Sequence, residues 1–192
     1  MAEKTRYQWA GETPIHIDYH DNEWGRPVHD EQKLFEMLIL EGMQAGLTWL
    51  TVLKKRESFR KAFDGFDPKK VARYGDAKIE KLMANEGIIR HRLKITSTVV
   101  NAKLFLKIVK EHGSFDKFIW GYVDHKPIVN RRKKIEEIPA TTPVSDKISQ
   151  DLKKMGFKFV GSTIIYAFMQ ATGMVNDHIT SCFAYKEMSR DD

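Results

Sequence analysis

Cysteine is almost absent from this chain of 192 residues, which contains only Cys182. One cysteine cannot form a disulfide within the chain, so the cross-linked frameworks of small secreted proteins are excluded. Apolar runs long enough to cross a membrane are also missing, and the first six residues lack the hydrophobic segment of a secretory signal. We therefore expect a cytoplasmic protein with no membrane anchor.

The charge of the chain is unbalanced toward positive. Lysine and arginine number 32 against 26 acidic residues, which gives a formal net charge of +6 and a sequence pI of about 9.3. This balance favours polyanionic partners such as nucleic acid, but an ordinary soluble basic protein has the same signature. The chain is long enough to bury one good-sized core, and we expect a single domain over residues 1–192 with its two terminal segments packed together.

Strand patterns are scarce, whereas apolar residues recur at helical spacing along the chain, often after a capping residue. The predicted helices begin at or just after Asp30, Thr48, Asp67, Asp76, Ile89, Ser114, Ser145 and Ser162, and the last is expected to stop at Gly173. Residues from about 124 to 143 have the composition of a long polar connection. The pattern predicts an all-α protein.

A single carboxylate, Glu41, falls among apolar residues of the helix predicted over residues 30–44. A buried carboxylate is costly unless a partner meets it. The two glycines that follow, and then Trp49, favour a pocket for a flat ligand that donates hydrogen bonds. Tyr19 and Trp24 are further candidates for its lining, and aromatic faces beside an anion suit a cationic ligand. The plainer alternative pairs Glu41 with an arginine and buries Trp49 in the core.

Residues 76–96 combine a short helix, a glycine turn and the start of a long helix. The first N–H groups of a helix lack partners and can bind a phosphate. Together with cationic side chains this is the layout of a helix-hairpin-helix element on a nucleic-acid backbone, although an ordinary helical corner has the same features. The candidate phosphate-binding residues are Gly87, Ile88, Ile89, Arg90, His91, Arg92 and Lys94.

Two further groups of residues invite a chemical interpretation. His178 and Cys182 stand one helical turn apart, which suits a tetrahedral zinc ion, and His20 is a third candidate ligand. Three ligands are fewer than a closed structural site uses, so the alternative is that these groups hydrogen-bond to one another. The basic run 131–134 is either a solvated loop or a further contact with phosphates.

Blocks spread over nearly the whole chain resemble the DNA-3-methyladenine glycosylase I family. They are collinear from about Tyr7 to Cys182, which makes the resemblance far more specific than any single motif. The matching blocks are YHDNEWG at 19–25, LEGxQAGLxW at 40–49, VLKKRE at 52–57, GIIRHR at 87–92, GFKFVG at 156–161 and VNDH at 175–178.

The resemblance implies a base-excision repair enzyme with the compact helical glycosylase fold of the helix-hairpin-helix superfamily. Such enzymes flip an alkylated adenine out of double-stranded DNA and hydrolyse its N-glycosidic bond, which releases free 3-methyladenine and leaves an abasic site. 3-Methylguanine is a further candidate substrate. No lysine occupies a recognisable nucleophile position, so we expect a monofunctional glycosylase without lyase activity, acting as a monomer.

The same resemblance assigns roles by position. Glu41 is expected to be the catalytic residue and, with Tyr19, to hydrogen-bond the edge of the base, while Trp49 stacks on its face and Trp24 lines the pocket. Methylation at N3 makes the purine cationic and already a good leaving group, so an anion that favours this cation can replace a strong acid. The corner formed by Gly46 and Leu47 is expected to face the gap left by the flipped nucleotide, and residues 87–92 to hold phosphates.

The chain departs from the family at a structural zinc site, which relatives build from two cysteines and two histidines. His20, His178 and Cys182 match three of those positions, but Tyr7 stands where the second cysteine is expected. A neutral tyrosine is a poor zinc ligand. The site is therefore empty, or completed by water or another side chain, or much weakened, and the chemistry requires no cofactor.

Two other functions compete with this interpretation. One is a non-catalytic module that binds damaged or distorted DNA on the same fold. The other is a zinc-dependent hydrolase that uses His20, His178 and Cys182.

Overall fold

The computed structural model describes residues 5–6, 11 and 13–189 of the chain. This part is predominantly helical, which confirms the prediction of an all-α protein. In chain order the elements are α1 (Pro14–Asn22), α2 (Glu31–Gln44), α3 (Trp49–Ala62), η2 (Asp64–Phe66), α4 (Pro68–Val71), α5 (Asp76–Met83), α6 (Arg92–His112), α7 (Phe115–Trp120), η3 (Gly121–Val123), β1 (Ile128–Val129), η4 (Ile135–Glu137), α8 (Pro143–Met155), α9 (Ser162–Ala171), β2 (Val175–Asn176) and α10 (Phe183–Glu187).

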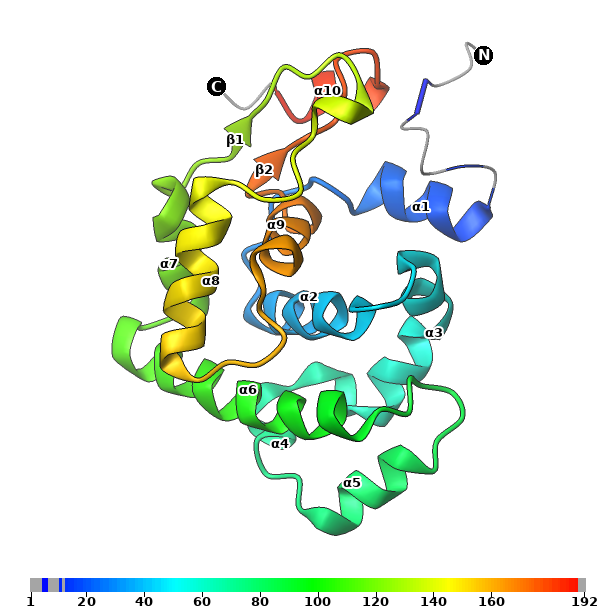
Figure 1. The fold of residues 1–192 in the computed structure, drawn as a ribbon, viewed down its shortest axis with the longest axis vertical. Helices are drawn as coiled ribbons and strands as arrows, with labels where there is room; N and C mark the ends of the chain where they lie inside the picture. The colour runs from blue at the N-terminus through cyan, green and yellow to red at the C-terminus, as the bar shows by residue number, and fades with distance from the viewer. Residues whose placement is uncertain (1–4, 7–10, 12, 190–192) are drawn as a thin grey trace.

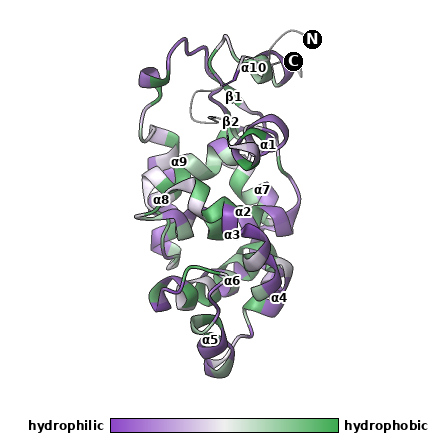
Figure 2. Ribbon diagram, turned by 90° about the vertical axis from the view of Figure 1, so that its right-hand side faces the viewer, coloured by the Kyte–Doolittle hydropathy of each residue, from purple (hydrophilic) through white to green (hydrophobic). Residues whose placement is uncertain are grey.

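Helix α2 lies at the centre of the molecule, with α9 above it, α6 below it, α3 on one side and α7 on the other (Figure 1). It is surrounded because ten consecutive residues, 34–43, are buried, including two carboxylates. Figure 2 shows the result in colour: α2 and α9 are largely green, whereas α3 shows purple polar residues on the outside. Burial of the apolar side chains of α2 contributes to the stability of the core.

Capping side chains fix the starts of six of the described helices, mostly where the sequence predicts them: α2, α3, α4, α6, α7 and α8. The carboxylate of Asp30 accepts the N–H of Lys33 at 2.8 Å, and the hydroxyl of Ser114 accepts the N–H of Lys117 at 2.9 Å. None of the described helices is long and apolar enough to cross a bilayer.

Two helices begin at residues other than those predicted. Helix α6 starts at Arg92 rather than near Ile89, because His91 Nδ1 accepts the N–H of Lys94 and thereby caps the helix. Helix α8 starts at Pro143, two residues early, because Thr142 is the capping residue. Ser145, where the helix was predicted to begin, is the N3 residue of the capping box and binds the backbone N–H of Thr142.

The segment predicted as a polar connection between residues 124 and 143 is tied to the C-terminal part of the chain. Strand β1 within it pairs in parallel with β2, with Ile128 opposite Val175 and Val129 opposite Asn176. The pairing holds the residues that follow β1 beside those that follow β2. Two distant parts of the sequence therefore build one end of the molecule (Figure 1).

Gly173 closes the corner between α9 and β2, where the chain passes against the backbone of residues 26–27. Its φ of +71° is one that L side chains rarely adopt, and a Cβ at this position would lie 2.3 Å from the carbonyl carbon of Arg26. Gly113, at the end of α6, has a similar φ of +86° but no atom closer than 4.0 Å to the same point.

We expect Gly173→Ala to lower the free energy of unfolding by about 3 kcal/mol or more, because a backbone clash adds to the conformational cost. Gly113→Ala is the matched control and should lose only about 1–2 kcal/mol, the cost of the left-handed conformation alone. Urea unfolding of both variants measures the two values. Equal losses would contradict the close packing of residue 173 on residues 26–27.

Candidate active site

A cavity of about 400 Å³ opens where α1, α2, α3 and α9 meet the segment that contains η4. This volume is in the range of small-molecule sites. Its lining residues are His16, Tyr19, Trp24, Glu41, Gln44, Trp49, Ile135, Ile138, Ala167 and Gln170. A larger hollow of about 530 Å³, lined by Arg26 and His125 among others, contains none of the predicted site residues.

The four residues predicted for base recognition all line this cavity. Tyr19 comes from α1, Trp24 from the turn after it, Glu41 from α2 and Trp49 from the first residue of α3. The rings of Tyr19 and Trp49 lie 5.3 Å apart between centroids, tilted by 49°. The indole N–H of Trp49 is buried and has no hydrogen-bond partner within the described part of the chain, so it is available to a ligand.

Glu41 is only 4% exposed, and its carboxylate makes no hydrogen bond to any residue that the structure describes. Burial disfavours the charged form and raises the pKa of Glu41 to about 8, although the positive charge of Arg56 acts in the opposite direction. The same burial, and then the negative charge of Glu41, raise the pKa of the Tyr19 hydroxyl. The site therefore holds a carboxyl group that a cation would ionise.

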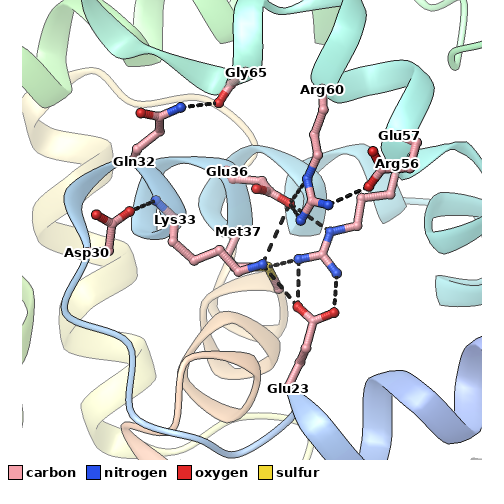
Figure 3. Close-up of polar contacts among 10 residues, drawn as sticks. All are labelled: Glu23, Asp30, Gln32, Lys33, Glu36, Met37, Arg56, Glu57, Arg60 and Gly65. Atoms are coloured by element: carbon pink, nitrogen blue, oxygen red, sulfur yellow. Dashed lines mark hydrogen bonds and ion pairs between the residues drawn. The ribbon is translucent and has the colours of Figure 1, made fainter.

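Arg56 explains why Glu41 stays without a partner. Its guanidinium donates from Nη1 and Nη2 to the two carboxylate oxygens of Glu23, each at 2.8 Å, and from Nε to Glu36 at 2.7 Å (Figure 3). Lys33 and Arg60 complete this buried network on the same two carboxylates. All three nitrogens of Arg56 are thus engaged elsewhere, which rules out the alternative that Glu41 is neutralised by an internal arginine.

Several lining residues were not identified from the sequence. His16 lies three residues before Tyr19 and therefore on the same face of α1, a spacing that could have indicated it. Gln44 is part of the block that resembles the family. Ile135 and Ile138 are two apolar residues in a polar segment, which was their only signal. Gln170 donates from Nε2 to Asp177 at 2.8 Å, a contact that the sequence does not reveal.

The corner between α2 and α3 carries the exposed residue expected to face the gap in DNA. Gly46 has a φ of +77°, and the side chain that follows, Leu47, is 42% exposed. Lys94 of α6 supports this corner, because its ammonium group donates to the carbonyl oxygens of Met43 and Ala45 at 2.8 and 2.6 Å. Lys94 was predicted to contact phosphates, but its side chain is buried and binds carbonyl oxygens at the C-terminal end of α2 instead.

Residues 84–91 form the predicted hairpin between α5 and α6. Ile88 is buried and anchors it, while the backbone N–H groups of Ile89 and Arg90 donate no hydrogen bond within the described chain. The side chains of Arg90 and Arg92 are exposed but already face carboxylates, those of Glu86 at 3.5 Å and Glu80 at 2.6 Å. Backbone amides are thus the readiest donors that this hairpin offers to a phosphate.

The three predicted metal ligands do meet. His20, His178 and Cys182 are buried, and their ligand atoms lie within 4.8 Å of one another. The Nδ1 atom of His20 contacts Asp21 at 2.9 Å and that of His178 contacts Asn176 at 3.1 Å, which turns both Nε2 atoms toward the cluster. This arrangement is typical of zinc ligands and their supporting residues.

The donor set fits zinc with three protein ligands, because the Nε2 atom of His178 is buried without a hydrogen-bond partner in the described chain. Tyr7, which the sequence aligns with a fourth ligand, lies outside the described residues. The ring of Trp24 contacts that of His178 at 4.5 Å and also lines the cavity, so it stands between the cluster and any ligand. A zinc ion here would join the terminal segments, and a buried cluster of this kind is unsuited to hydrolysis of a substrate.

Comparison with known proteins gives a consistent result over nearly the whole chain. Residues 9–185 match the methyladenine glycosylase family. A DNA-3-methyladenine glycosylase of Haemophilus influenzae is 53% identical over 178 residues, which cover 93% of this chain and 96% of that protein.

Solved structures agree with this match. The crystal structure of a 3-methyladenine DNA glycosylase I superposes with a TM-score of 0.91 at 51% identity and covers 93% of this chain and 98% of that one. A tyrosine-to-phenylalanine variant of a 3-methyladenine DNA glycosylase I, solved in complex with 3-methyladenine, superposes with a TM-score of 0.90 at 37% identity and covers 92% of this chain and 95% of that one.

The raised pKa of Glu41 predicts how stability changes with pH. The folded protein keeps this proton up to about pH 8, whereas the unfolded chain loses it near 4.5, so the contribution of Glu41 to the free energy of unfolding falls as the pH rises between these values. Glu41→Gln removes the charge. We expect the variant to match the wild type in stability near pH 5 and to exceed it at pH 9, by at most about 5 kcal/mol.

Thermal unfolding at the two pH values measures this difference. Glu36→Gln is the matched control: it also removes a buried carboxylate of α2, but one that Arg56 and Arg60 bind, so it should destabilise the protein at both pH values. A difference between Glu41→Gln and the wild type that does not change with pH would contradict the ionisation of Glu41 in the folded state.

Proposed function

Because this chain belongs to the methyladenine glycosylase family, we infer that it is a DNA-3-methyladenine glycosylase that acts in base-excision repair. It hydrolyses the N-glycosidic bond of 3-methyladenine in alkylated DNA. The observation in this structure that supports the function best is the unpartnered carboxyl group of Glu41 in an aromatic cavity. A cationic base that can donate hydrogen bonds supplies what this carboxyl group lacks.

The mechanism starts from the charge of the substrate. N3-methylation makes the adenine positive and a good leaving group, so the protein need not protonate it strongly. We propose that the flipped base enters between Trp49 and the opposite wall, that Glu41 ionises and accepts N–H groups from its edge, and that Tyr19 adds a further hydrogen bond. When the C1′–N bond breaks, its electron pair goes to the base, which leaves as neutral 3-methyladenine, and positive charge develops on the sugar, where the negative charge of Glu41 stabilises it. Water adds to the sugar carbon and releases a proton, which leaves the abasic site.

Selectivity follows from the same group. Ionising Glu41 in the empty cavity costs about 5 kcal/mol relative to water, and only a positively charged ligand recovers this energy. Normal adenine is neutral and gains nothing from the ionised form. Extrusion of a damaged base from the duplex is also cheaper than extrusion of an intact one. Charge and shape together therefore discriminate against undamaged DNA.

The DNA is held outside the cavity. We propose that the amides of the hairpin 84–91 bind phosphates and that Leu47 fills the gap left by the flipped nucleotide, since it is exposed beside Trp49 at the start of α3. No lysine lines the cavity among the described residues, which supports hydrolysis without a covalent intermediate and without strand cleavage.

Base release tests the function directly. Incubated with methylated duplex DNA, the wild type should release 3-methyladenine, and Glu41→Gln should do so at least about 100-fold more slowly, because a neutral amide does not attract the cation. For the wild type, kcat/KM should rise with pH toward a plateau above about 8. Glu111→Gln, an exposed glutamate of α6, is the control and should leave release unchanged.

Salt-dependent DNA binding with no base release by the wild type would instead favour a non-catalytic DNA-binding module. Full release by Glu41→Gln would contradict the role of Glu41 without touching the family assignment.

We further propose that His20, His178 and Cys182 bind a structural zinc ion. The purified protein should then contain about one zinc per chain, and Cys182→Ala should lose it and unfold at a lower temperature. Base release should be insensitive to a chelator at temperatures well below unfolding, since the cluster is separated from the cavity. Glu41→Gln is the control that should retain the metal. A metal-free wild type, with no change in unfolding temperature on addition of zinc, would contradict this proposal.

A further inference from the structure

The segment of residues 131–138, here called the lip, forms one wall of the cavity although its sequence has the composition of a solvated loop. It follows β1 and contains η4, and the side chains of Ile135 and Ile138 line the cavity. Both isoleucines also pack against the hydrophobic core. Apolar contacts thus hold the C-terminal part of the lip in place.

Polar contacts hold the N-terminal part of the lip, around Arg132. Arg132 donates from Nε to Asp177 at 3.0 Å and from Nη1 to the carbonyl oxygen of Glu137, while its own carbonyl oxygen accepts the N–H of Thr180 at 2.8 Å. Asn130 donates to the same oxygen of Asp177 at 2.7 Å. Asp177 is fully buried, so the lip is attached to an ionic centre that is shielded from solvent screening.

Of the four basic residues of the lip, only Arg132 makes side-chain contacts to described residues that hold the lip in place. Arg131, Lys133 and Lys134 are exposed, and their side chains form no ion pair or hydrogen bond within the described chain. The carboxylate of Glu137 is directed to the backbone N–H of Lys133, at 2.9 Å, rather than to a cationic group. The exposed arginines of the hairpin, by contrast, already face carboxylates.

The position of these three cations matters because of where a flipped nucleotide must lie. When its base occupies the cavity, its phosphates remain at the mouth, and Lys134 is bonded directly to the lining residue Ile135. A residue spans at most about 3.6 Å, so even Arg131 begins within about 15 Å of the lining. Figure 1 shows the hairpin at the lower right, the yellow-green lip at the top, and α1 with the start of α3 between them.

We propose that Arg131, Lys133 and Lys134 bind DNA phosphates next to the flipped nucleotide, as a second grip on the backbone besides the hairpin. The proposal rests on the glycosylase function inferred above. Ile135 and Ile138 cover the base, and the cations before them hold the strand from which it comes. The lip thereby connects occupancy of the cavity to binding of the DNA backbone.

The test compares two triple variants that lose the same charge. The lip variant is Arg131→Gln, Lys133→Gln and Lys134→Gln. The control is Lys103→Gln, Lys107→Gln and Lys110→Gln, three exposed residues in the half of α6 that runs away from the hairpin. Affinity for a duplex containing a stable abasic-site analogue is measured between 50 and 300 mM salt for each protein, with thermal unfolding as the check on folding.

We expect the slope of log affinity against log salt to fall by about 2 to 3 in the lip variant, since each phosphate that the protein no longer neutralises lowers it by about 0.9. The slope should stay near the wild-type value in the control. Binding of free 3-methyladenine should be equal in all three proteins, because the substituted side chains do not line the cavity. Equal slopes in the two triple variants, or weaker free-base binding together with weaker DNA binding in the lip variant, would overturn the proposal.

A base-release assay on the same wild-type preparation separates this proposal from the function on which it rests. If the wild type releases 3-methyladenine but the lip variant and the control have equal salt slopes, only the proposed role of the lip in DNA binding is overturned. A difference in slope without release supports the lip as a DNA contact and overturns the glycosylase function.

Discussion

The structure depends on one carboxyl group that is kept without a partner. Glu41 lies among buried residues of the central helix, and Arg56, whose charge acts on it, is bound on three nitrogens by Glu23 and Glu36. Had Arg56 turned to Glu41, the cavity would contain a neutral ion pair with no preference for charge. The buried network around Arg56 therefore has two effects: it fastens the end of α1 to α2 and α3, and it leaves the acid of the site available.

Because burial raises the pKa of Glu41 to about 8, the cavity favours a cationic ligand over a neutral one. The energy that burial takes from the charged form is returned only when an opposite charge enters, so affinity is greatest for the ligand that carries the damage. The folded protein bears this cost on α2, where ten consecutive residues are buried.

The sequence predicted the helical class, most helix starts and the four residues that meet at the cavity, because these follow from local spacing, caps and the family resemblance. It did not predict what depends on contacts between distant segments. Lys94 looked like a phosphate ligand, but whether a lysine reaches solvent or a helix end depends on tertiary packing. Ile135 and Ile138 could not be assigned either, because the pairing of β1 with β2 and the contact of Arg132 with Asp177 bring them to the cavity.

The proposed lip is positively charged and exposed, whereas Glu41 is an acid and buried. This arrangement matches the distribution of charge in the substrate. A nucleotide that contains 3-methyladenine is positive at the base and negative at the phosphate. In the proposed binding mode, the buried acid meets the base and the exposed cations of the lip meet the phosphates. Water screens the outer contacts, so they suit a long DNA backbone met at many positions, whereas the buried acid acts without screening on one group. In this arrangement the exposed cations contribute to binding of any DNA, and the buried acid contributes to discrimination between charged and neutral bases.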